Sequence, residues 1–148
     1  MATPPRLLIC NGKGGVGKTT TTANIGGLAA ANGYRVLIIE LDPQCNQQEE
    51  LGFTSQYPDN AFVNALLTRQ NPPIVAGVRP NLDVIEAGDE LDDIVGIKLA
   101  KGMRGRGATP TIGEDLEALI APIASNYDLI IYDTPPRELA LTTAAMET

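Results

Sequence analysis

The interpretation of this sequence starts from Cys10-Asn11-Gly12-Lys13-Gly14-Gly15-Val16-Gly17-Lys18-Thr19-Thr20. Residues 12–19 match G-x-x-x-x-G-K-T, the P-loop pattern, whose glycines leave room for backbone N–H groups to surround a phosphate. In this pattern Lys18 places its charge against the β- and γ-phosphates, and the Thr19 hydroxyl can hold Mg²⁺. A glycine-rich turn alone would explain the glycines but not the Lys18-Thr19 pair. We therefore expect a nucleotide to be bound by Gly12, Lys13, Gly14, Gly15, Val16, Gly17, Lys18, Thr19 and Thr20.

The segments on either side of this loop have the residue types of a strand and a helix. Leu7-Leu8-Ile9-Cys10 is a short apolar run typical of a buried strand, and we expect the first strand at residues 6–11. Residues 19–32 contain many small side chains, which predicts a helix packed closely on the sheet and ended by Asn32-Gly33. A bound phosphate would then lie at a helix N-terminus, where backbone N–H groups favour anions.

A second predicted strand, residues 35–42, ends in the acids Glu40 and Asp42. Its β-branched middle is typical of a strand buried on both faces. Together with the first strand and helix it forms a βαβ unit, whose strands are parallel. Ligands of such sheets bind at the carboxyl ends of the strands. We therefore expect Asp42 on the same rim as the P-loop, although an acidic strand end in solvent would give the same residues.

Asp133 ends another predicted strand, residues 128–133, in the Walker B pattern of four apolar residues before an acid. On the rim of a parallel sheet it would bind magnesium through water, beside Thr19. We expect one more strand at residues 81–87 and helices at residues 47–52, 61–67, 91–99, 111–123 and from residue 137 onward. The sequence thus predicts an α/β fold: a P-loop NTPase-like parallel sheet flanked by helices, in a single domain over residues 1–148.

Composition narrows the classes of function. The 148 residues are 43% apolar with a net charge of −7, which argues against a broad nucleic-acid-binding surface. With no histidine and two cysteines, histidine-based catalysis and a cysteine zinc site are excluded, and we expect Cys10 to be a small buried apolar group. The basic stretch 101–107 could touch nucleic acid or an acidic partner, but a surface loop explains it better. No apolar run could span a bilayer and no signal peptide precedes Arg6, so we expect the cytoplasm.

A second lysine, Lys13, stands where the P-loop pattern does not require one. It is either a solvated loop lysine or a cation aimed at a phosphate on a second subunit. The run K-G-G-V-G-K-T-T, residues 13–20, resembles the deviant Walker A box of the ParA/MinD group of ATPases. E-L-D-P-Q-C-N, residues 40–46, and D-T-P-P, residues 133–136, resemble boxes of the ParA-type partition ATPases, except that Glu40 replaces the first aspartate.

This resemblance implies ATP and Mg²⁺ as cofactors and a homodimer that forms with ATP. Lys13, Lys18 and Asp42 would be the catalytic residues: Lys13 would reach the partner's ATP, and Asp42 would orient the attacking water. Pro135 would lie near the γ-phosphate in a switch loop. The implied role is partition of plasmid, phage or chromosomal DNA, with slow hydrolysis stimulated by a centromere-binding, ParB-like partner protein.

ParA-type proteins resemble the chain from about residue 5 to its end and usually continue beyond it. We therefore expect a fold that is incomplete at its C-terminus, with one face of the parallel sheet uncovered. The following segment would supply non-specific DNA contacts, and the intact relative would associate with the nucleoid and not with a membrane. Two alternatives stay open. A MinD-like positioning ATPase would use a C-terminal amphipathic helix on membranes, and a non-hydrolysing truncated regulator would dimerise with a full-length relative.

Overall fold

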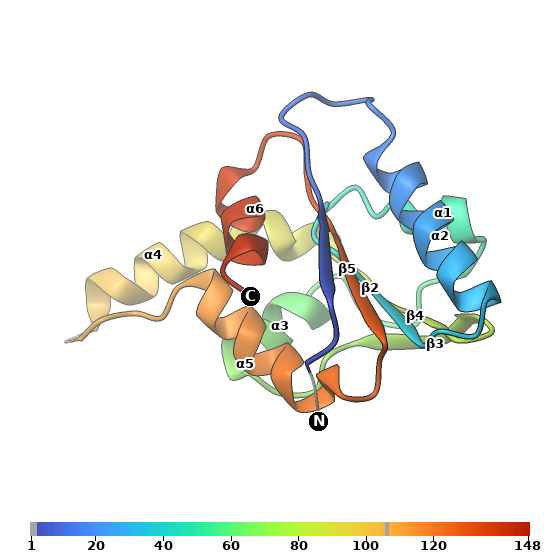
Figure 1. Ribbon diagram of the computed structural model, residues 1–148. Helices are drawn as coiled ribbons and strands as arrows, with labels where there is room; N and C mark the ends of the chain where they lie inside the picture. Colours follow the sequence, from blue (N-terminus) through green and yellow to red (C-terminus); the bar gives the residue numbers. More distant parts are fainter. Residues whose placement is uncertain (1–2, 106) are drawn as a thin grey trace.

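The computed structural model describes residues 3–105 and 107–148 and builds them around one five-stranded sheet in the order β1-β5-β2-β4-β3 (Figure 1). Strands β1, β5, β2 and β4 are parallel, as predicted, and β3 pairs antiparallel with β4 at one edge. The strands are β1 Arg6–Ile9, β2 Val36–Glu40, β3 Ile74–Arg79, β4 Leu82–Ile85 and β5 Leu129–Asp133.

Strand β3 is the one strand of this sheet that the sequence did not predict. It follows Pro72-Pro73 and turns into β4 at Pro80-Asn81, where Asn81 has a φ of 64°. Gly77 has a φ of 64° inside the strand, and the β3–β4 register shifts between Val75 and Arg79. This irregularity breaks the alternation of apolar and polar residues by which a strand is recognised in a sequence.

Helices cover both faces of the sheet, so the open part is the β1 edge and not a face. Figure 1 shows α1 and α2 on one side and α3, α5 and α6 on the other. Among the described residues, no helix is both long and apolar enough to cross a membrane. The helices are α1 Lys18–Ala31, α2 Gln47–Leu51, α3 Ala61–Thr68, the 3-10 helix η1 Asp89–Asp93, α4 Ile94–Arg104, α5 Ile112–Ala124 and α6 Leu139–Met146.

The structure corrects two predictions made from the sequence. Part of the basic stretch predicted as a surface loop, Lys101–Arg104, forms the last turn of α4, while Arg106 lies outside the described residues. Cys10 is exposed, not buried. The reason is that β1 ends at Ile9 and pairs only with β5 among the described strands, so the residue after it lies at the rim of an open edge.

The central strand β2 explains why both faces need helices. Leu37 and Ile39 point into the core with α3, α5 and α6, while Val36 and Ile38 point into the core under α1 and α2. All five residues of β2 are buried. An apolar run with both sets of side chains buried is typical of a parallel strand between two helical layers.

Helix α1 lies close to the sheet because Gly26 faces it. A Cβ atom at Gly26 would lie 2.8 Å from Cδ1 of Ile38, whereas nothing lies within 4 Å of a Cβ atom at Gly27. The helix ends at Ala31, and Gly33 follows with a φ of 91°, so the predicted stop signal is confirmed. This close packing fixes the start of α1, and with it the P-loop, relative to β2.

We expect Gly26→Leu to lower the free energy of unfolding by about 1–3 kcal/mol, because the added side chain overpacks the contact with Ile38. Gly27→Leu is the matched control: it adds the same atoms one residue away, and helix propensity should stabilise it by up to about 0.8 kcal/mol. Urea unfolding followed by circular dichroism measures both. Equal losses of stability in the two variants would contradict the close approach of α1 to the sheet.

Candidate phosphate and magnesium site

The candidate site lies at the carboxyl ends of β1, β5 and β2, where three loops come together at the top of Figure 1. Two hydrogen bonds join the strand ends below these loops. The Thr134 hydroxyl donates to the carbonyl of Ile9 at 2.9 Å, and the Leu41 N–H donates to the carbonyl of Asp133 at 2.8 Å. The first residues of the three loops are therefore held together before any ligand binds.

The P-loop has the backbone geometry that its glycines predict. Gly15 and Gly17 have φ values of 71° and 84°, a conformation that glycine adopts without steric cost. Helix α1 begins directly after Gly17, and its first internal bond runs from the N–H of Thr21 to the carbonyl of Gly17 at 2.8 Å. The free N–H groups of the first turn therefore face the loop, where they can bind an anion.

A hollow of about 470 Å³ opens in front of this helix terminus. It brings the P-loop together with Asp42, as the sequence predicted from strand order. Among its described lining residues the basic one is Lys18, and three are acids. The hollow is lined by Gly15, Val16, Gly17, Lys18, Thr19, Thr20, Asp42, Gln44, Asn46, Glu49, Glu50 and Pro136.

A second hollow, of about 510 Å³, lies on the other side of the P-loop and contains Gly12 and Pro135. Pro136 lines both hollows. A Cβ atom on Gly14 would lie 3.8 Å from the Cβ atom of Pro136, so the loop after β5 packs directly against the P-loop. The Pro135-Pro136 segment is therefore placed to respond to whatever occupies the P-loop.

The two lysines of the loop have different surroundings. The Nζ atom of Lys18 lies inside the loop and donates to the carbonyl of Lys13 at 3.4 Å, which is near the limit for a hydrogen bond. Lys13 is exposed, and its backbone N–H donates to Oδ1 of Asn11 at 2.9 Å. Lys18 is thus turned toward its own loop, while the Lys13 side chain is free to face a second molecule.

Asp133 is fully buried beneath the P-loop and linked to Thr19. The Gln47 side chain bridges the two residues by donating to Oδ2 of Asp133 at 2.8 Å and to the carbonyl of Thr19 at 3.1 Å. Burial raises the pKa of Asp133, and the hydrogen bond from Gln47 opposes that shift.

These residues fit a hydrated magnesium ion. The Oδ1 atom of Asp133 is buried and has no hydrogen-bond partner among the described residues. A buried carboxylate oxygen needs a donor or a cation, and a magnesium ion with its water ligands supplies both. Thr19 and Asp133, which Gln47 joins, both carry the hard oxygen atoms that magnesium prefers, and they are the pair for which the sequence predicted this role.

Glu40 is the neighbour of Asp133 on the adjacent strand and has no exposed surface. Burial raises the pKa of Glu40 to about 8; the charge of Asp133 adds to the shift, and the N–H of Gln47 opposes it. Its Oε1 atom accepts that N–H at 3.0 Å. A fully buried side chain cannot touch a nucleotide in the hollow, so Glu40 acts on the site only through the residues it holds.

Asp42 is 8% exposed and lies on the wall of the hollow. Its Oδ1 atom accepts the N–H of Gln44 at 3.0 Å, which fixes the turn after β2. This bond holds one carboxylate oxygen in place against the turn. Asp42 therefore has the position and the fixed geometry to hold a water molecule against a bound phosphate.

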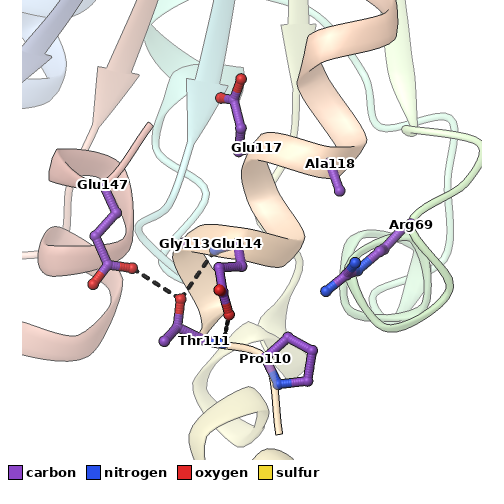
Figure 2. Close-up of a pocket in the computed structure, with 8 residues that line it drawn as sticks. All are labelled: Arg69, Pro110, Thr111, Gly113, Glu114, Glu117, Ala118 and Glu147. Carbon is purple, nitrogen blue, oxygen red and sulfur yellow. Dashed lines mark hydrogen bonds between the residues drawn. The ribbon is translucent and has the colours of Figure 1, made fainter. Parts of the chain in front are cut away.

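A larger hollow, of about 780 Å³, lies elsewhere, between α5, the end of α6 and Arg69 (Figure 2). Its polar groups already have partners. Glu147 accepts from the Thr111 hydroxyl at 3.0 Å, Glu114 accepts the N–H of Thr111 at 2.7 Å, and Arg69 donates to Asp115 at 2.9 Å. Three glutamates line this hollow, so it repels phosphate, and we assign it to the packing of α5 on α6.

Sequence reasoning missed several residues of the site, of which Gln47 is the most deeply buried. Gln44 and Asn46 belong to a quoted motif but were given no role, and Gln47 lies just after that motif. A single uncharged glutamine outside a motif cannot be recognised as a site residue from the sequence. The one available signal was its position shortly after the acidic end of β2. The lining residues not predicted as site residues are Gln44, Asn46, Glu49, Glu50 and Pro136.

Comparison with known proteins agrees with this geometry. A family model described as AAA domain (AAA_31) matches residues 6–148. The chromosome partitioning protein ParA of Caulobacter vibrioides is 38% identical over 149 residues, covering 98% of this chain and 53% of that protein. The sporulation initiation inhibitor protein Soj of Bacillus subtilis is 35% identical over 144 residues, covering 95% and 53%. The chain thus spans about half the length of the curated relatives it matches.

Solved structures with the same fold include nucleotide complexes. One is cobyrinic acid a,c-diamide synthase from Mycobacterium smegmatis with an ATP analogue and magnesium, with a TM-score of 0.77 at 28% identity over 96% of this chain and 54% of that one. Another is an ATP complex of McdA from Cyanothece, with a TM-score of 0.76 at 25% identity over 98% and 53%. The overlap confirms the α/β fold expected from the sequence.

We expect Lys18→Ala to weaken binding of Mg-ADP by about 100-fold, because it removes a charge-assisted contact to phosphate from a hollow that is otherwise lined by acids. Isothermal titration calorimetry measures the affinity. Lys101→Ala, which removes an exposed lysine of α4, is the control and should bind as the wild type does. If Lys18→Ala bound Mg-ADP as tightly as the wild type, the P-loop would not be the nucleotide-binding site.

Proposed function

This chain belongs to the AAA domain family, among its ParA-type partition ATPases, and we propose that it works as an ATP-dependent switch for DNA partition. In this proposal it binds ATP with Mg²⁺, dimerises in the ATP state and hydrolyses ATP slowly until a partner protein stimulates it. The relatives named chromosome partitioning protein ParA and chromosome-partitioning ATPase Soj, from Caulobacter vibrioides and Thermus thermophilus, support this choice.

One observation carries the proposal: the P-loop and Asp42 line one hollow, and Gln47 joins Thr19 to the buried Asp133 beside it. Phosphoryl transfer needs positioned charge more than covalent chemistry by the protein. Lys18 supplies the positive charge at the β- and γ-phosphates. Thr19 and Asp133 would hold the magnesium ion, which neutralises phosphate charge when bound. Asp42 orients the attacking water from the wall of the hollow.

Lys13 has no phosphate to contact within its own loop, since Lys18 already occupies that position. In a dimer with the two P-loops facing each other, its exposed side chain would reach the phosphates of the second subunit. That arrangement explains the additional lysine and makes the complete catalytic charge depend on dimerisation. It favours a hydrolysing switch over a non-hydrolysing regulator, which would not need Asp42 on the wall of the hollow.

The partners follow from the family. We propose that the dimer contacts DNA non-specifically through segments beyond these residues, and that a ParB-like centromere-binding protein stimulates hydrolysis. The net charge of this chain is −7, which agrees with DNA contacts made by segments outside it. In the cell, such an ATP-bound dimer would be found on the nucleoid.

Asp42→Ala should bind Mg-ATP within a few-fold of the wild type and hydrolyse it at least about 100-fold more slowly, because the attacking water loses its acceptor. Phosphate release measured under single-turnover conditions tests this, with Glu90→Ala, an exposed acid of η1, as the control. Wild-type turnover by Asp42→Ala would show that Asp42 has no part in hydrolysis, whereas a wild type that releases no phosphate would favour a non-hydrolysing regulator.

Lys13→Ala should bind Mg-ADP within about twofold of the wild type but lose the dimer that forms with Mg-ATP, because the cation between the subunits is gone. Sedimentation equilibrium with each nucleotide measures the dimer constant, and Lys101→Ala controls for loss of a surface charge. If Lys13→Ala dimerises and turns over ATP as the wild type does, the lysine is only a solvated loop residue.

A further inference from the structure

We propose that Gln47 is a positioning residue that sets the affinity of the site for magnesium. It would do so by holding Asp133 and Thr19 in the arrangement that receives the ion. This inference rests on the proposed function, since it concerns the same nucleotide site. It adds a residue to which neither the P-loop pattern nor the acidic strand ends assigned a role.

The hydrogen bonds of Gln47 determine how its amide is oriented. Its Nε2 atom lies 2.8 Å from Oδ2 of Asp133 and 3.1 Å from the carbonyl oxygen of Thr19. Both partners are acceptors, so only the NH₂ group of the amide can face them. Each of its two N–H bonds is used, one on each member of the magnesium pair. The side chain therefore fixes the separation of Asp133 from the first turn of α1.

The main chain of Gln47 is fixed as firmly as its side chain. Gln47 has no exposed surface and begins helix α2, and its N–H donates to Oε1 of Glu40 at 3.0 Å. Glu40 is opposite Asp133 in the register of β2 and β5. Gln47 thus connects the ends of two neighbouring strands to the P-loop helix through three hydrogen bonds.

Gln47 and the two acids beside it also carry buried oxygen atoms that have no hydrogen-bond partner among the described residues. Among the described residues, the buried side-chain acceptors without a hydrogen-bond partner include Oε1 of Gln47, Oε2 of Glu40 and Oδ1 of Asp133. Buried acceptors of this kind are costly unless a donor reaches them. A hydrated magnesium ion carries several O–H donors, which the unpartnered Oδ1 atom of Asp133 could accept.

The role of Gln47 follows from these contacts. Residues that hydrogen-bond to metal ligands orient them, and their loss typically weakens metal affinity by about 10–100-fold. Without the amide, the Asp133 carboxylate has no hydrogen-bond donor among the described residues and can turn away from Thr19. Gln47 would not touch the nucleotide itself, because its side chain is buried. Gln47 should therefore affect magnesium affinity and leave metal-free nucleotide binding unchanged.

The neighbouring residue provides a matched control. Gln48 lies on the same helix and its Nε2 atom donates to a carboxylate oxygen, Oε1 of Glu86, at 2.7 Å. It makes no hydrogen bond to the P-loop or to β5 among the described residues. Gln47→Met and Gln48→Met each replace an amide by an apolar chain of similar length, so they differ in which carboxylate loses its donor.

The experiment measures binding of a fluorescent ADP analogue at increasing Mg²⁺ and, separately, in excess EDTA. For Gln47→Met we expect the half-saturating Mg²⁺ concentration to rise 10–100-fold, with affinity in EDTA within twofold of the wild type. Gln48→Met should match the wild type in both. The proposal would be overturned if Gln47→Met and the wild type needed the same Mg²⁺ concentration. It would also be overturned if Gln47→Met lost the same nucleotide affinity with and without Mg²⁺. A wild type that binds no nucleotide at all would instead overturn the proposed function.

A second measurement uses the wild-type chain and does not depend on how a variant folds. In ¹⁵N-labelled protein with ADP, the side-chain NH₂ resonances of Gln47 and Gln48 can be followed while Mg²⁺ is added. We expect the Gln47 resonances to shift at the Mg²⁺ concentration that saturates the site and those of Gln48 to stay in place. Gln47 resonances that do not move on saturation would contradict its contact with the magnesium pair.

Discussion

The site depends on one buried negative charge, the Asp133 carboxylate at the end of β5. This strand lies between β1, which leads into the P-loop, and β2, which leads to Asp42. A buried carboxylate needs hydrogen-bond donors, and helix α2 supplies one to its Oδ2 atom. Gln47 is that donor, and the same amide donates to the carbonyl of Thr19, so the contact that stabilises the buried charge also ties the P-loop helix to the strand ends. Fold stability and ligand binding are therefore served by the same hydrogen bonds.

Charge also explains why the hollow would work with cations and with a second copy of the chain. Lys18 faces Asp42, Glu49 and Glu50 among the lining residues, and Glu50 already accepts the Thr20 hydroxyl at 2.6 Å. Phosphates entering this hollow meet more negative than positive charge. Magnesium held by Thr19 and Asp133 would offset part of the repulsion, and Lys13 from another subunit would offset more. A site that is electrostatically incomplete alone is suited to a switch that closes on dimerisation.

The sequence was most informative where a residue type is required by geometry. A glycine-rich loop with Lys18-Thr19 and acids at strand ends predicted that the P-loop, Asp42 and Asp133 lie at neighbouring strand ends, and the structure has them there. It was least informative where the geometry is made by contacts across the fold. Strand β3 was missed because Gly77 and a register shift interrupt its pattern, and Cys10 was misplaced because strand order decides which edge is open. Gln47 could not be found because its partners lie 28 and 86 residues away in the chain.

The central claim is that three loops at the strand ends form one nucleotide site, and amide hydrogen exchange of the wild-type chain tests it most directly. Exchange with Mg-ATP would be compared with exchange in EDTA without nucleotide. The account predicts that Mg-ATP slows exchange in peptides covering residues 10–20, 41–50 and 133–138. It predicts no change in exchange in residues 110–118, several of which line the larger hollow. Protection confined to residues 110–118, or unchanged exchange at the P-loop with saturating Mg-ATP, would contradict it.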